Sequence, residues 1–312
     1  MPVETASFPL PLEQAQDEAL NGKNDQARIV GIRSLRYHID DATDDTQLRI
    51  NTSILDLYGS ITHEYRRAFE SRIAAGETPE EAAGRIRNHP VITAISEALR
   101  RILSRPALQG GCFDHEHAWR LDFLELNGCN LAYAVLKGAS LCHSNLAQSR
   151  LEHTDLSEAD LSGVDFSGAR LAHADLSDAE LSGAKLAWAD LSHARMNRAF
   201  INQADLTGAV LDHALLHHAF LSETDMTKAS LTGADLTGAN VFAAKLSQVR
   251  LQEADLTGTG ITSERIRALT LSVQASPETR WGMESDRDGI NPLASTYYEE
   301  QPPGEEERLS PA

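Results

Sequence analysis

Four histidines recur at intervals of twenty residues, at His153, His173, His193 and His213, and Tyr133 stands one interval before them. Imidazole titrates near neutral pH and is a common ligand for zinc and nickel. A metal site needs ring nitrogens that converge on one ion at about 2.0–2.1 Å. Side chains that repeat along a regular array lie parallel, so we expect a solvent-exposed column, with metal binding and pH sensing as the alternatives.

A second set of side chains is acidic and follows the same interval. It consists of Asp155, Glu158, Asp160, Asp175, Asp178 and Glu180. A regular array of carboxylates imitates the phosphate charges of DNA. Basic residues such as Arg150, Arg170, Lys185, Arg195 and Arg198 interrupt the set. We therefore expect a solvated acidic face, and mimicry of DNA is the alternative.

A third set is apolar where the neighbouring segments are polar. Its members are Phe200, Val210, Leu215 and Phe220. Exposed apolar clusters mark interfaces, so we predict a partner-binding patch that wraps several sides of the molecule. The alternative is that another part of the same chain covers the patch.

No spacing indicates an enzyme. The sequence has no glycine-rich phosphate loop before a helix and no Gly-x-Ser-x-Gly elbow. The segment FDHEHAWR at 113–120 lacks the His-Glu-x-x-His zinc spacing, and Cys129 falls at a small-residue position typical of a core. We predict neither catalytic residues nor a cofactor.

The composition limits the partners. The net charge of −18 disfavours direct binding of nucleic acid or of anionic membranes. No apolar run is long enough to cross a membrane, and the start of the chain lacks a secretory signal. Three cysteines without a Cys-x-x-Cys motif fit a reducing cytoplasm. A protein partner or a second copy of the chain is therefore expected.

All three sets lie within a block that repeats every five residues. From Leu121 to Ile261, every fifth residue is apolar, and most residues two positions before are small. Neither a helix nor a strand has this period. With segments such as TGADLTGAN, residues 119–261 resemble the pentapeptide-repeat family, whose consensus is Ala-Asp/Asn-Leu-x-x.

The resemblance implies a mainly β fold, a right-handed quadrilateral β-helix with twenty residues per coil and about seven coils. The central apolar residue and the small residue two before it then point inward, and the other three positions point outward. The family includes gyrase-binding members that resemble B-DNA, and bacterial effectors. The chain departs from the gyrase-binding group because its repeats carry no projecting loop and a helical region precedes them.

The flanking segments complete the predicted domain organisation. Residues 1–22 are expected to be disordered and residues 23–105 to form an α-helical domain. Within it, 27–39 resembles the Arg-x-x-Gly-Ile-x-x-Leu helical segment found upstream of some pentapeptide-repeat regions, and TPEE at 78–81 is a capping box. Residues 106–118 are a predicted linker, 262–274 a short C-terminal capping helix and 275–312 an acidic tail.

These features favour a non-enzymatic protein–protein interaction scaffold. The alternatives are a DNA-mimicking regulator or protector of DNA gyrase or topoisomerase, and a bacterial effector.

Overall fold

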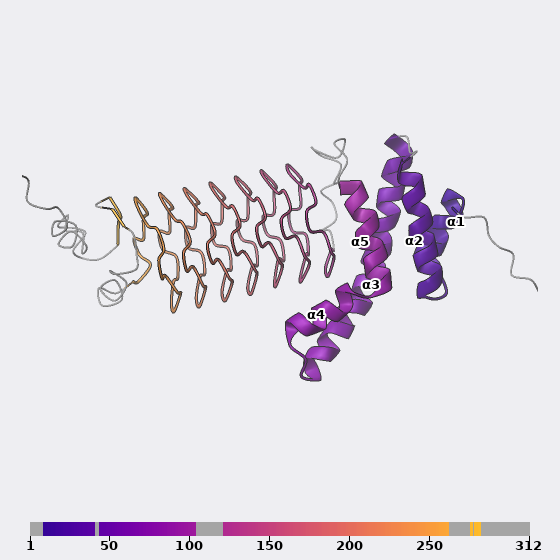
Figure 1. Cartoon of the computed structure of the whole chain (residues 1–312), viewed down its shortest axis with the longest axis horizontal. Helices are drawn as coiled ribbons and strands as arrows, with labels where there is room; N and C mark the ends of the chain where they lie inside the picture. Colours follow the sequence, from indigo (N-terminus) through magenta and orange to yellow (C-terminus); the bar gives the residue numbers. More distant parts are fainter. Residues whose placement is uncertain (1–8, 41–43, 104–120, 262–274, 277, 282–312) are drawn as a thin grey trace, which may run out of the picture.

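The computed structural model describes residues 9–40, 44–103, 121–261, 275–276 and 278–281. Helices α1 (Leu12–Asn21), α2 (Asp25–Asp40), α3 (Asp44–Ala74), α4 (Pro79–Arg87) and α5 (Pro90–Leu103) form the N-terminal region. An elongated solenoid follows at one end of this helical domain (Figure 1). None of the described helices has the length and apolar character that crossing a membrane requires.

The helices follow the expected local signals. The capping box is present, because the Thr78 hydroxyl accepts from the Glu81 backbone N–H and the Glu81 carboxylate accepts from the Thr78 backbone N–H. In α3, Ile50, Ile54 and Leu57 point into the core at helical spacing.

The prediction that residues 1–22 lack regular structure is wrong for 12–21, which form α1. Ala15 and Ala19 of α1 are fully buried against α2. A side chain at Gly31 would place its Cβ 2.3 Å from the Ala19 backbone nitrogen. Small residues on both helices thus allow a close backbone approach, which hydropathy alone does not reveal.

We expect Gly31→Ala to displace α1 from α2 and to lower the thermal unfolding temperature of the helical domain. The new methyl group would overlap the α1 backbone, which cannot move aside as a flexible side chain can. Hydrogen exchange of 12–21 measures the displacement. Gly84→Ala, where no atom lies within 4 Å of the added Cβ, is the matched control.

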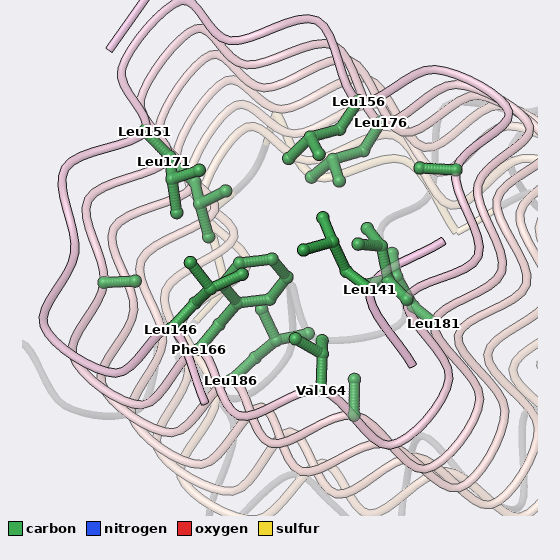
Figure 2. Close-up of a cluster of buried hydrophobic side chains, with 14 of the residues drawn as sticks. Leu141, Leu146, Leu151, Leu156, Val164, Phe166, Leu171, Leu176, Leu181 and Leu186 are labelled. Carbon is green, nitrogen blue, oxygen red and sulfur yellow. The ribbon is translucent and has the colours of Figure 1, made fainter. Parts of the chain in front are cut away.

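The solenoid is built from isolated parallel bridges between residues twenty apart, from Glu125–Asn145 to Asp235–Asp255. Among the described residues no longer strand is present. Four five-residue repeats therefore complete one coil. Leu151 and Leu171 lie on one wall, Leu156 and Leu176 on the next, and Leu141 and Leu181 on a third (Figure 2).

The inward assignment of the central residues is confirmed. Leu156, Leu176 and Leu206 are fully buried, and so is Ala174 at a small position. Cys129 is buried at such a position, 3% exposed. The two inward residues of each repeat fill the interior with alternating large and small side chains.

The predicted linker and capping helix lie outside the described residues. The tail assignment of 275–312 is wrong for its first residues, because Arg280 pairs with Asp255 as a further step of the solenoid. Trp281 is 2% exposed and covers the end of the core. Residues beyond the regular repeat thus continue the coil, which satisfies backbone groups that an open end would leave unpaired.

Candidate functional site

The twenty-residue spacing of the bridges assigns each outward residue to one side of the coil. Phe200 and Phe220 are bridge partners and stack with ring centroids 4.7 Å apart. Leu215 lies on the neighbouring side, and Val210, ten residues from each phenylalanine, lies on the opposite side. The predicted patch therefore wraps the coil, and only the two phenylalanines form one surface. We name the side containing residues 200–202, 220–222 and 240–242 the phenylalanine side.

The phenylalanine side holds a third ring that sequence reasoning missed. Phe242 follows Asn240, the bridge partner of Phe220, by two residues and is 71% exposed. Phe200 and Phe220 are 40% and 39% exposed, so the described helices leave them accessible. The sequence does contain a signal for Phe242. In the other repeats, the residue directly after the central apolar residue is small or polar.

The acidic residues have a structural role. In the repeat of Leu156, four of the five backbone N–H groups bond to backbone carbonyls, and the remaining one, on Ser157, bonds to Oδ1 of Asp155 at 3.0 Å. The same side chain-to-backbone bond recurs at other repeats, for example from Ser177 to Asp175. The Asp before the central residue thus accepts from the one backbone N–H of the repeat that finds no backbone carbonyl.

In the repeats of Phe220 and Leu215, where this cap residue is apolar, an Asn of the preceding coil replaces it. The Ser222 N–H, in the repeat of Phe220, donates to Oδ1 of Asn202 at 3.1 Å. The His217 N–H, in the repeat of Leu215, donates to Oδ1 of Asn197 at 3.2 Å. The backbone therefore stays satisfied while Phe220 and Leu215 face solvent.

The six predicted acidic residues do lie together, on two adjoining sides of two successive coils. Basic side chains neutralise four of them, in the pairs Glu158–Lys137, Asp160–Arg66, Asp175–Arg195 and Asp178–Arg198. The Arg198 guanidinium, which bonds both carboxylate oxygens, holds the pKa of Asp178 below its ordinary value. The face thus presents less negative charge than its composition indicates.

The histidine column is a ladder of parallel rings. Tyr133 stacks on His153 at 4.9 Å, and the three following pairs of histidine rings are 4.8, 4.8 and 5.1 Å apart. All five residues have positive φ, near +60°, so each side chain leaves a left-handed corner in the same direction. Among the described residues, no group of three or more His, Cys, Asp or Glu could hold a metal ion.

No exposed cysteine thiol occurs among the described residues. Cys129 and Cys142 are buried, and burial raises the pKa of the Cys142 thiol, with neighbouring Asp122 adding to the shift. His115, Glu116 and His117 of the FDHEHAWR segment lie outside the described residues.

The helical domain docks on the first coils at the near end of the phenylalanine side. Phe69 of α3 packs against Phe123 and His143, with ring centroids 5.3 and 4.7 Å away. Arg66 of α3 lies 3.8 Å from the buried Asp122 carboxylate and 3.4 Å from Asp160. Burial raises the pKa of Asp122, although the Ser140 hydroxyl and Arg66 oppose the shift.

Helix α4 extends this contact along the adjacent side. Its Arg87 pairs with Glu125 and donates to the His143 carbonyl. Its Glu80 pairs with Lys185, which lies three coils after Glu125 in the same column. The helices and solenoid therefore share a polar and aromatic interface.

We expect mild acid to weaken this interface through His143. Burial, followed by the charge of Arg87, lowers the pKa of His143 from its ordinary value of 6.5, although Asp160 opposes the shift. The unfolded chain then binds the proton more readily than the folded chain. The stabilisation is complete above pH 6.5 and declines as the pH falls from 6.5 toward the folded pKa.

Thermal unfolding between pH 7.5 and 5 measures this decline. The comparison is with His143→Gln, which should show a shallower loss because it lacks the imidazole whose pKa is lowered in the folded chain. Equal slopes for the two proteins would contradict the role of His143.

Comparison with known proteins adds a family model and several solved structures. The model described as pentapeptide repeats matches residues 125–163, 159–198 and 204–241, in 8 copies. The chain is 32% identical to HetL, a pentapeptide repeat protein involved in heterocyst differentiation regulation in the cyanobacterium Nostoc. That alignment covers 45% of this chain and 69% of HetL, with a TM-score of 0.31.

Two further solved structures have lower identity. QnrB1, a plasmid-mediated fluoroquinolone resistance protein, is 20% identical over 52% of this chain and 84% of its own, with a TM-score of 0.36. A pentapeptide repeat protein from the thylakoid lumen of Arabidopsis thaliana is 22% identical over 52% of this chain and 83% of its own, with a TM-score of 0.16. Curated protein sequences give no match.

Proposed function

Because this chain belongs to the pentapeptide-repeat proteins, we propose that it is a non-enzymatic scaffold that presents one side of a rigid solenoid to a protein partner. In this proposal the solenoid is a right-handed coil of about seven turns. Its binding residues are Phe200 and Phe220, together with Phe242.

The exposed rings of the phenylalanine side carry this proposal. Three exposed phenylalanines gather on one side of the solenoid, and such rings dominate the energetics of protein interfaces. The solenoid backbone beneath them is fixed by hydrogen bonds, so binding costs little ordering entropy.

Mimicry of DNA at a topoisomerase is the weaker proposal. The acidic face is the feature that would carry it, but four of its six carboxylates are ion-paired and several cap the backbone. A role as a bacterial effector has no particular residue in its favour.

Capture of partners from cell lysate, with identification by mass spectrometry, tests the scaffold proposal. The intact chain should retain a specific protein that the double variant Phe200→Ser/Phe220→Ser loses. Trp188→Ser is the matched control, because Trp188 is 66% exposed but lies in a different column. Identical captures from all three proteins would refute the assigned surface, and topoisomerase subunits retained by all would favour the acidic face.

A further inference from the structure

The phenylalanine side already binds one helix of this chain at its near end. Helix α3 places Phe69 against the rings of Phe123 and His143, and places Arg66 beside Asp122 and Asp160. Arg66 and Phe69 are three residues apart and therefore lie on one helical face. The solenoid thus binds a helix through two contacts, an aromatic contact and a guanidinium–carboxylate contact.

The same two kinds of group recur farther along this side, where none of the described helices covers them. Phe200, Phe220 and Phe242 are exposed there. Glu180 is the bridge partner of Phe200, Glu223 follows Phe220 by three residues at the adjoining corner, and Asp205 lies just across that corner. Within the described part of the chain, Glu180, Asp205 and Glu223 form no ion pair with a basic side chain.

We propose that this far part of the phenylalanine side binds one amphipathic helix of a partner protein. Apolar side chains of that helix cover the three phenylalanines, and its Lys or Arg side chains lie against Glu180, Asp205 and Glu223. This inference rests on the proposed scaffold function and adds the chemistry of the partner.

Two observations favour a basic helix over other occupants. The surface lies on the same side of the solenoid as the interface that holds α3, and that interface also combines aromatic rings with carboxylates. A second copy of this chain, related by two-fold symmetry, would place two copies of the same acidic surface face to face. A partner helix with Lys or Arg instead supplies the opposite charge.

A displayed peptide library tests the proposal. Each member is an 18-residue helix with a fixed apolar stripe, and the positions beside the stripe vary among Lys, Arg, Glu and Gln. The full chain is the bait, and peptides that also bind Phe220→Ser are removed. Phe220 is exposed at the surface, and thermal unfolding verifies that this variant stays folded.

We expect the recovered peptides to be enriched in Lys and Arg beside the stripe. A synthetic peptide of the recovered sequence should bind Phe220→Ser at least tenfold more weakly, and binding to the intact chain should weaken in salt. Asp205→Asn combined with Glu223→Gln should also reduce affinity, and Trp188→Ser should leave it unchanged.

Three outcomes would overturn the proposal. They are the absence of enrichment over the Phe220→Ser bait, an enrichment of Glu, and a dimer of the chain that Phe220→Ser dissociates in analytical ultracentrifugation. If the lysate capture still returns a protein that depends on Phe200 and Phe220, the scaffold function stands and only the basic-helix chemistry fails.

Discussion

Leu176→Asp is expected to abolish the cooperative thermal unfolding transition of the solenoid. Leu176 is fully buried and lies on the same wall as Leu156 (Figure 2). Removing a buried leucine side chain alone costs about 2–5 kcal/mol. An unpaired carboxylate in the same interior costs more, because the buried hydroxyls of Ser144, Ser149 and Thr154 already donate to backbone carbonyls.

The effect should reach the coils on both sides, since each coil is stabilised mainly by its neighbours. Circular dichroism during heating measures the transition, and hydrogen exchange locates the coils that open. An unchanged transition would show that the central residues do not form the core.

Leu215→Asp is the matched control, because it makes the same substitution at an outward position. Leu215 is 38% exposed and occupies the place where other repeats carry a capping Asp. The new carboxylate can accept from the His217 N–H, as Asp155 does from Ser157. We therefore expect a transition within a few degrees of that of the intact chain.

Arg66→Glu is expected to separate the helical domain from the solenoid. The substitution would place a third carboxylate beside Asp122 and Asp160, and the Asp122 side chain is fully buried. The change leaves the buried Asp122 charge uncompensated. Because the Arg66 side chain is 40% exposed, the cost should fall below that of a fully buried pair, which is about 3–5 kcal/mol. Small-angle scattering should show an increased radius of gyration, and Cys142 should become accessible to thiol reagents.

Arg36→Glu is the control for this change, because the Arg36–Glu97 pair is exposed within the helical domain. It should leave the radius of gyration and the protection of Cys142 unchanged. The double variant Arg66→Met/Asp122→Asn should restore docking, since it removes both charges together. A compact Arg66→Glu protein with a protected Cys142 would contradict this account of the interface.

The solenoid interior could be predicted from the sequence alone. Each repeat places its central apolar residue and its small residue in nearly the same surroundings, so one local rule, repeated from Leu121 to Ile261, specifies the inward positions. The capping box at Thr78 is likewise a local signal, completed within four residues.

The prediction of which candidate residues share a column is confirmed. The spacing of twenty placed Phe200 with Phe220 and the four histidines in one ladder, and the structure shows both stacks. Phe242 was missed because it occupies a different position of its repeat, two residues after the bridge partner of Phe220.

Only the tertiary structure decided the contacts between distant segments. The polar composition of α1 predicts disorder, whereas its burial depends on the close approach that Gly31 of the next helix allows. The ion pairs of Asp160 and Lys185 depend on helix residues 94 and 105 positions earlier in the chain. The local spacing of residues does not predict such contacts, because they form only when separately folded surfaces meet. The sequence by itself thus determined the coil and its columns, and tertiary packing determined which columns are covered, neutralised or left open to a partner.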